Sequence, residues 1–225
     1  MRHVTGAVSA VVLLMSSLTW AAAPEPANDE QKTLYALGAA ISQSLGPFTL
    51  NESELEFVKA GLVDGVLKHP PKVDLQVYGP KIQQMQQVRA TALAEVEKKA
   101  GAGFLTKAAT EPGAKKTESG AIVTVIKEGK GATPKATDTV KVHYHGTLTD
   151  GTVFDSSVKR GEPATFPLNQ VIKCWTEAVQ LIKVGGKSKL VCPSGIAYGD
   201  RGSPPVIKPG ATLVFEVELL DIVKQ

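Results

Sequence analysis

The apolar residues in the first half of the chain recur every three or four positions, which is the spacing of one face of an α-helix. The first stripe consists of Leu34, Leu37, Ile41 and Leu45, and a Gly-Pro pair follows it. A second stripe lies in residues 55–67, just after Asn51 and Glu54, which have the spacing of a capping box. The pattern therefore predicts two short helices, the second with a defined first turn.

A third stripe begins after Asp74, a residue suited to cap a helix, and it is much longer. Its apolar members are Leu75, Tyr78, Ile82, Met85, Ala92 and Val96. The helical pattern extends to about Ala109, and a helix of roughly 35 residues is about 50 Å long. Two shorter helices cannot cover that length. We therefore expect residues 30–100 to form a homodimer, with the polar part after Val96 as a projecting arm. A compact three-helix bundle is the alternative.

The hydrophobic period changes from 3.6 to 2 after residues 111–120, a segment that contains Pro, Gly, Ser and several lysines. Beyond it, Val140, Val142, Tyr144 and Gly146 alternate with polar residues, as on a strand with one buried face. The Asp150-Gly151 pair that follows is typical of a hairpin turn. We expect a helical domain over residues 22–110 and a second domain over residues 111–225.

Further strands are predicted at Ile122–Ile126, around Phe166, at Lys187–Cys192 and at Ala211–Val223. One short helix with a single apolar face interrupts them; its apolar residues are Trp175, Ala178, Val179 and Ile182. Many antiparallel strands with one short helix make this half an α+β domain.

The first 21 residues have the pattern of a secretory signal. Arg2 and His3 precede an apolar run, and cleavage after Ala21 places Thr19 and Ala21 at the two positions that a signal cleavage site fills with small residues. The run is shorter than the roughly 20 apolar residues that span a bilayer, although an N-terminal anchor is the alternative. No later segment predicts a stable membrane span. Export would place Cys174 and Cys192 in an oxidising compartment, where they either pair or remain two buried thiols.

Composition and charge exclude several classes of function. The 225 residues are 43% hydrophobic and carry a net charge of +3, with no basic cluster that would suit nucleic acid. His143 and His145 could share a metal only with ligands that the sequence does not place nearby. Ser194 is not in a nucleophile elbow, and no phosphate or dinucleotide motif is present. We expect chemistry without a metal, a cofactor or a covalent intermediate.

Four motifs give the second domain a family resemblance. They are VHYHGTLTDGTVFDSS (Val142–Ser157), VIKCW (Val171–Trp175), AYG (Ala197–Gly199) and ATLVFEVELL (Ala211–Leu220). In this order they resemble the FKBP-type peptidyl-prolyl cis–trans isomerases. The helical front, with YALGAAI at Tyr35–Ile41, resembles the dimerising domain of the exported Mip-type members. The resemblance implies an antiparallel half-barrel wrapped around a short helix, behind an all-helical dimerisation domain with a long linker helix.

The resemblance also implies a pocket for the substrate proline. The matching catalytic positions are Tyr144, Phe154, Asp155, Trp175, Tyr198 and Phe215, and the matching substrate-binding positions are Phe166, Val171, Ile172 and Ile207. Trp175 would be the floor, and the aromatic residues would be walls. The amide of Ile172 and the hydroxyl of Tyr198 would hold substrate carbonyls, and Asp155 would accept a hydrogen bond at the edge. Any one of these aromatic residues alone would more often belong to an ordinary core, but their joint occurrence favours a pocket.

The sequence departs from the family pattern at several positions. Ala164 stands where many relatives carry an aromatic residue, and Cys174 replaces the usual glycine before Trp175. Because Cys192 shares a face with Leu190, directed toward the short helix that Cys174 begins, we expect a Cys174–Cys192 disulfide. A Cα separation beyond about 7 Å would exclude it.

The expected function is isomerisation of X-Pro bonds in exported polypeptides in the periplasm, with a secreted or outer-membrane-associated protein as variants of that location. The resemblance further implies that unfolded or proline-containing chains are substrates and that macrolide inhibitors of the family bind. The competing hypothesis is a periplasmic chaperone whose helices hold unfolded chains and whose pocket is accessory.

Overall fold

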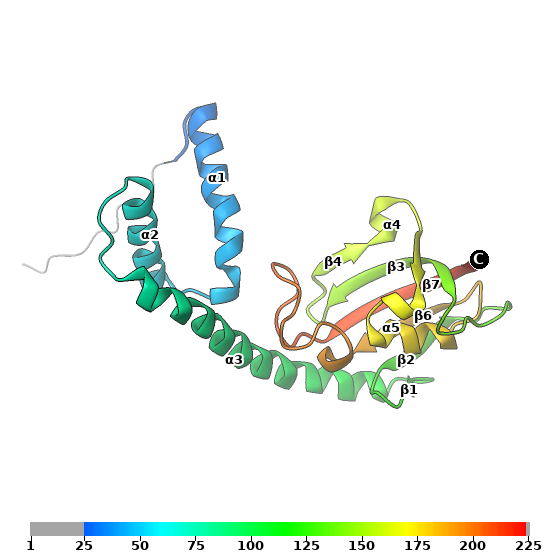
Figure 1. Cartoon of the computed structure of the whole chain (residues 1–225). Coiled ribbons are helices and arrows are strands. Elements are labelled where there is room, and N and C mark those ends of the chain that lie inside the picture. The colour runs from blue at the N-terminus through cyan, green and yellow to red at the C-terminus, as the bar shows by residue number, and fades with distance from the viewer. Residues whose placement is uncertain (1–24, 224–225) are drawn as a thin grey trace, which may run out of the picture. The chain divides into compact units, whose positions relative to one another are not determined.

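The computed structural model describes residues 25–223, in which a helical region precedes a sheet domain (Figure 1). By its internal contacts the chain divides between Ala40 and Ile41, within the first helix. The larger unit therefore contains everything from Ile41 onward, including the longest helix and the whole sheet. The predicted signal segment, residues 1–21, lies outside the described residues.

Three helices form the helical region: α1 (Asp29–Leu45), α2 (Glu52–Val66) and α3 (Leu75–Ala109). A short 3₁₀ turn, η1 (Gly46–Phe48), follows α1. The capping box at the start of α2 is confirmed, because the Asn51 side chain accepts from the Glu54 amide and the Glu54 carboxylate accepts from the Asn51 amide. Among the described residues, neither α1 nor α2 has a buried side chain.

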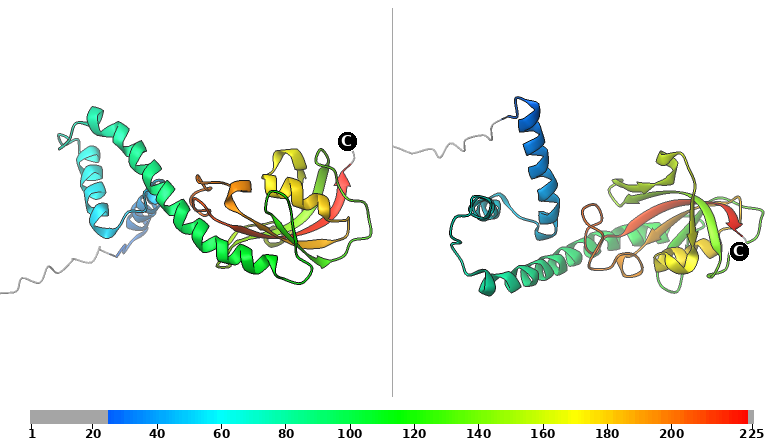
Figure 2. Two further views of the ribbon diagram at one scale, coloured as in Figure 1. Left: turned by 90° about the horizontal axis from the view of Figure 1, so that it is seen from below. Right: turned by 45° about the horizontal axis from the view of Figure 1, so that its top comes forward.

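Helix α3 differs from the expectation in its second half. The predicted projecting arm is wrong, since the polar C-terminal half lies along the sheet domain in both views of Figure 2. The buried residues of α3 are Ala94, Gly101 and Ala108, each seven positions after the last. A seven-residue interval returns to the same helix face, so small residues form the contact. Phe104 and Leu105 pack beside Ala108, whereas a search for large apolar residues could not detect the contacts at Ala94 and Gly101.

The sheet domain contains seven antiparallel strands. They are β1 (Lys115–Lys116), β2 (Ile122–Lys127), β3 (Thr139–Leu148), β4 (Val153–Ser156), β5 (Ala164–Pro167), β6 (Lys187–Cys192) and β7 (Leu213–Val223). Their order is β1-β2-β6-β7-β3-β4, and β5 pairs with β3. The predicted strands are confirmed, whereas β1 lies in the segment expected to be a linker.

The alternation predicted along β3 is observed. Val140 and Val142 are fully buried, and Tyr144 is 5% exposed. This face packs on helix α5 (Lys173–Ala178) and on the 3₁₀ turn η3 (Val179–Leu181), which together form the predicted short helix. The core therefore lies between α5 and one face of the sheet, and it presents the aromatic residues of β3 and β7 to Trp175.

The remaining elements are short: α4 (Ser157–Arg160), η2 (Leu168–Gln170) and η4 (Ser194–Ile196). Helix α4 begins with a Ser156 cap and ends at Gly161, whose φ of +79° suits glycine. None of these turns was predicted. Within residues 25–223 no helix is both long enough and apolar enough to cross a membrane.

Candidate functional site

The aromatic residues of the core surround a pocket of about 380 Å³ at one end of the sheet. Its lining residues come from six elements and two connections, and they are Tyr144, Phe154, Asp155, Phe166, Gln170, Val171, Ile172, Trp175, Tyr198 and Phe215. The strand residues are held by sheet register, because Gly146 pairs with Asp155 on β4 and with Phe215 on β7. Gly146 also makes room, since a Cβ there would meet the Phe154 ring at 2.7 Å.

Trp175 lies at the centre of the aromatic group. Its ring centroid is 5.3 Å from Tyr144, 5.8 Å from Phe166 and 5.3 Å from Phe215, in each case edge to face. Phe154 extends the set through Phe215, at 5.4 Å. Edge-to-face pairs at these distances are each worth about 0.5–1.5 kcal/mol beyond the burial of their area. The rings therefore support one another and give the pocket a preformed shape.

The indole nitrogen of Trp175 is the one buried side-chain nitrogen or oxygen without a hydrogen-bond partner in the part of the chain that the structure describes. A buried donor without a partner carries a desolvation cost of about 1–3 kcal/mol. The surrounding aromatic rings can compensate only weakly, through N–H to π contacts. The floor of the pocket is therefore apolar with one available donor.

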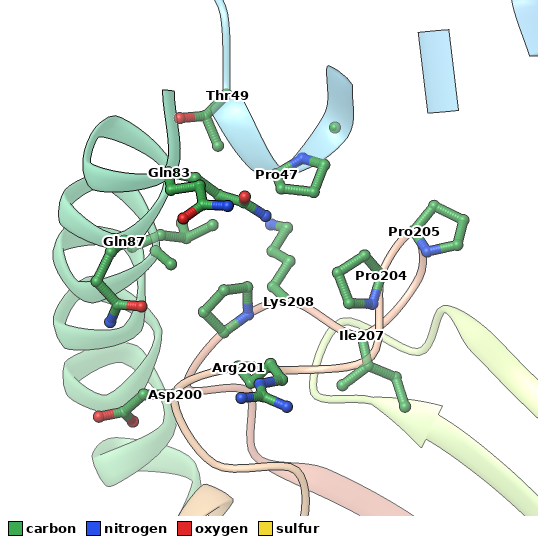
Figure 3. A pocket seen from close by; sticks show the side chains of 15 residues that line it. Pro47, Thr49, Gln83, Gln87, Asp200, Arg201, Pro204, Pro205, Ile207 and Lys208 are labelled. Atoms are coloured by element: carbon green, nitrogen blue, oxygen red, sulfur yellow. The ribbon is translucent and has the colours of Figure 1, made fainter. Parts of the chain in front are cut away.

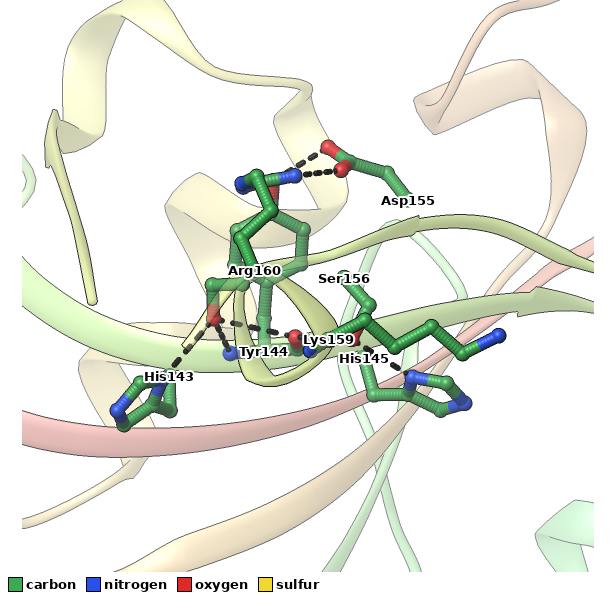
Figure 4. Close-up of polar contacts among 8 residues, drawn as sticks. His143, Tyr144, His145, Asp155, Ser156, Lys159 and Arg160 are labelled. Carbon is green, nitrogen blue, oxygen red and sulfur yellow. Dashed lines mark hydrogen bonds and ion pairs between the residues drawn. The ribbon is translucent and has the colours of Figure 1, made fainter. Parts of the chain in front are cut away.

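A polar cluster borders the pocket beside these rings. The Tyr144 hydroxyl donates to the Asp155 carboxylate, and the Arg160 guanidinium donates to the same carboxylate and, at 3.0 Å, to the Tyr144 oxygen (Figure 4). Burial raises the pKa of Asp155, but the hydrogen bonds from Tyr144 and Arg160 outweigh it and hold that pKa below its usual value. Burial, together with the Asp155 bond, raises the pKa of Tyr144. At neutral pH the site therefore has a carboxylate and a neutral phenol.

Two serines form hydrogen bonds with the strand that carries Tyr144. The Ser157 hydroxyl, fully buried, accepts the Tyr144 amide at 2.7 Å and lies 3.2 Å from Nδ1 of His143. Nδ1 of His145 lies 2.9 Å from the Ser156 hydroxyl (Figure 4). Both histidines thus form hydrogen bonds with serines at the start of α4, one with its cap and one with its first residue. In residues 25–223 no group of three ligand-type side chains comes together as a metal site.

The structure brings nine of the ten predicted pocket residues together. The exception is Ile207, which is 6% exposed in the core and lines a different cavity. Sequence reasoning missed Gln170 and Arg160. The charge of Arg160, five residues after Asp155, was the available signal, because one turn of helix between them brings the two side chains together.

The predicted disulfide is present. Cys174 and Cys192 are bonded, with a Cα separation of 5.8 Å, and both side chains are fully buried. The bond joins the start of α5 to the end of β6. Since Cys174 precedes Trp175, the crosslink fixes the pocket floor to the sheet.

A larger cavity, of about 830 Å³, lies between α3 and the loop after Tyr198. Figure 3 shows Gln83 and Gln87 on the helix side and Pro204 and Pro205 on the loop side. Its polar groups are amides and charges at the rim, including Arg201. The cavity has neither the aromatic enclosure of the smaller pocket nor an acid bonded to a phenol at its edge, so the smaller pocket is the candidate site.

Comparison with known proteins finds matches for both the helical region and the sheet domain. A family model described as FKBP-type peptidyl-prolyl cis–trans isomerase matches residues 130–220. A second model, the domain amino terminal to FKBP-type peptidyl-prolyl isomerase, matches residues 30–124. The two models together extend over the helical region and the sheet domain.

Individual relatives match over most of their length. The isomerase FkpA of Aeromonas hydrophila is 45% identical over 212 residues, which are 89% of this chain and 79% of that protein. The FKBP-type 22 kDa isomerase of Escherichia coli K12 is 43% identical, over 86% of this chain and 95% of that one. The crystal structure of FkpA from Escherichia coli superposes with a TM-score of 0.64 at 39% identity, over 87% of this chain and 97% of that one.

Proposed function

Because the chain belongs to the FKBP-type peptidyl-prolyl cis–trans isomerases and so catalyses rotation about X-Pro bonds, we propose that the aromatic pocket above Trp175 is where this reaction takes place. The single observation that carries the proposal is the enclosure of one apolar hollow by Trp175, Tyr144 and Phe215, with a carboxylate at its edge. A proline ring is the apolar, compact group that fits such a hollow.

The chemistry requires no proton transfer. The barrier to amide rotation is about 18–20 kcal/mol, because resonance is lost in the twisted state. A twisted amide has a less polarised carbonyl than a planar one, so an apolar pocket disfavours it less than water does. Groups that bind the twisted geometry more strongly than the planar one then accelerate the rotation.

Two donors are free to hold substrate carbonyls. Within residues 25–223 neither the Ile172 amide nor the Tyr198 hydroxyl donates to an acceptor of the chain. Ile172 precedes α5, where helix N-termini leave amides unpaired. Tyr198 is 40% exposed and borders the pocket. We assign them to the carbonyls on either side of the X-Pro bond.

Replacement of Tyr198 by Phe tests this assignment. We expect kcat/KM for an X-Pro peptide to fall about three- to tenfold, the value of one neutral hydrogen bond, with the far-ultraviolet spectrum unchanged. Exchange NMR of the peptide measures the rate. Tyr35→Phe, which removes a hydroxyl from α1, is the matched control. Equal rates for Tyr198→Phe and the control would remove Tyr198 from the mechanism.

We also propose that the chain is a homodimer through residues 30–100. Large apolar side chains of α1 and α2 are exposed in the single chain, among them Leu34, Leu37 and Phe57, which is 82% exposed. Such side chains are normally covered in a folded protein. Their burial against a second copy would stabilise helices that bury nothing alone.

Leu37→Glu should convert the dimer to monomer, since a charge would be buried at the interface. Light scattering at micromolar concentration is expected to give twice the chain mass for the wild type and for the control Gln43→Glu. A monomeric wild type would contradict the dimer. If that monomer also suppressed aggregation of an unfolded protein, the exposed side chains would instead bind clients.

Export to the periplasm is the third proposal. It rests on the pattern of residues 1–21 and on the Cys174–Cys192 disulfide, which requires an oxidising compartment to persist. Unfolded exported polypeptides would then be the substrates. N-terminal sequencing of the chain recovered after export is expected to begin at Ala22, and an intact Met1 would argue against it.

A further inference from the structure

The loop that carries Tyr198 is a closed unit. We define the Tyr198 loop as residues 198–210. The Gly210 amide donates to the Gly199 carbonyl at 2.9 Å, which joins its two ends, and Ser203 bridges to Ile207 across its interior. Tyr198 directly precedes this closure, and its carbonyl accepts from the Gly202 amide at 3.1 Å, so a displacement of the loop as a whole carries Tyr198 with it.

Helix α3 packs directly against the closure point of the loop. Ala94 is completely buried there, and a Cβ added to Gly210 would come within 2.6 Å of the Ala94 Cα. Two helical turns after Ala94, Gly101 faces Thr212. The two residues are so close that a Cβ added to Gly101 would collide with the Thr212 side chain. Backbones approach this closely only when both surfaces have small residues, so the contact fixes the loop at a defined distance from the helix.

Two ion pairs join the helix to the loop, and both start from helix residues that lie between Ala94 and Gly101. Lys98 of α3 pairs with Asp200 at 2.7 Å, and Glu97 pairs with Lys208 at 3.1 Å. One acid and one base on the helix thus meet one base and one acid on the loop. The hydrogen bond to Asp200, followed by the one to Glu95, raises the pKa of Lys98. Complementary charges in reversed order allow only one register between helix and loop.

We propose that the Ala94–Gly101 segment of α3 is a positioning element of the catalytic pocket, which holds the Tyr198 loop, and with it the Tyr198 hydroxyl, at the distance that the substrate carbonyl requires. The inference rests on the role proposed above for Tyr198. It makes the long helix part of the catalytic unit as well as a connection, and it couples the orientation of the helix to the activity of the pocket.

The expected coupling has a simple physical basis. A misplacement of about 1 Å at a positioned group can lower a rate by up to about a hundredfold. The first residues of the Tyr198 loop are attached to η4 by the Gly199 amide, which donates to the Ser194 carbonyl, but beyond them Pro204, Pro205 and Val206 are exposed and Ile207 is the buried anchor in the core. The contact with α3 therefore supplies the second attachment that a loop needs for a fixed orientation.

Ala94→Leu in the full chain is the first test. Ala94 is completely buried at the close approach of the helix to Gly210, so a larger side chain has no room there unless the helix and loop separate. We expect faster hydrogen exchange of the amides of residues 199–210, and a fall in kcat/KM for an X-Pro peptide of about tenfold. Ala100→Leu, the same substitution at an exposed position six residues along α3, is the matched control and should change neither.

A charge exchange provides a test that does not alter core packing. Lys98→Glu places two acids together and should speed exchange in the loop and lower kcat/KM by about two- to fivefold, since the pair is partly exposed. Asp200→Lys should do the same. The double variant restores the attraction between positions 98 and 200 in reversed order, although the acid at position 98 then lies beside Glu95. We therefore expect it to recover part of both loop protection and activity, which a general loss of stability would not do.

Three results would overturn the inference: unchanged exchange in residues 199–210 for Ala94→Leu, faster exchange with unchanged activity, or a double charge variant no better than either single one. Failure of the assignment of Tyr198 is distinguishable. Tyr198→Phe would then be fully active while Ala94→Leu still slowed catalysis, which would support positioning of the loop but not the part played by the hydroxyl.

Discussion

Asp155→Ala is expected to lower kcat/KM for an X-Pro peptide by about ten- to a hundredfold, the largest effect of any substitution considered. The carboxylate accepts from both the Tyr144 hydroxyl and the Arg160 guanidinium. Hydrogen bonds to a charged group are worth about 1.5–3 kcal/mol, and a factor of ten in rate corresponds to about 1.4 kcal/mol. Removal of Asp155 leaves a phenol and a cation without their acceptor at the border of an apolar pocket, and the Tyr144 wall loses its orientation.

Asp221→Ala removes the same charge from an exposed position on β7 and is the matched control. Asp155→Asn separates shape from charge, since it keeps the side-chain size and one acceptor oxygen, and we expect an intermediate rate. Circular dichroism confirms folding of each variant. If Asp155→Ala retained the rate of the control, the polar cluster would have no catalytic part and the pocket edge would need another explanation.

The second large effect concerns stability. Loss of the Cys174–Cys192 disulfide should lower the free energy of unfolding by about 3 kcal/mol, the entropic value for closure of a loop of this size. The two residues are 18 apart in sequence and both are fully buried. The corresponding fall in Tm is on the order of 10 °C for a domain of this length. Because Cys174 precedes Trp175, we also expect lower activity near the new Tm.

Calorimetry of the wild type with and without dithiothreitol measures this effect. The Cys174→Ala, Cys192→Ala double variant is the control, since a reductant should have no further effect on it. The oxidised chain should show no titratable thiol after denaturation. Two free thiols in the oxidised chain, or equal Tm values in the two conditions, would contradict a stabilising crosslink.

Most secondary structure was predictable because periodicity reports which face is buried. The 3.6 period located α3, and the 2.0 period along β3 placed Tyr144 on the inner face. Nine pocket residues were predictable only through the family resemblance, because an aromatic residue such as Phe166 has the same local pattern in a solid core as in a pocket. Packing across distant strands distinguishes the two, and local sequence does not encode it directly.

The errors have a physical cause of the same kind. Ile207 was expected at the pocket, yet it is buried in the core, on a loop that packs against α3. Ala94 and Gly101 carry that contact through close approach of backbones, and small residues give no hydrophobic signal. Arg160 reaches Asp155 across α4, a single helical turn that is too short to give a periodic pattern in the sequence.

The most direct test of the central claim is an NMR measurement of where the proline binds. The chain has two tryptophans, and Trp20 lies within the predicted signal segment, so Trp175 gives the one indole N–H resonance after its removal. With isotope-labelled protein and an unlabelled X-Pro peptide, we predict a saturable shift of that resonance and nuclear Overhauser effects between the proline ring and the Trp175 ring. Catalysed cis–trans exchange of the peptide with no such effects, and with an unmoved indole resonance, would contradict the account.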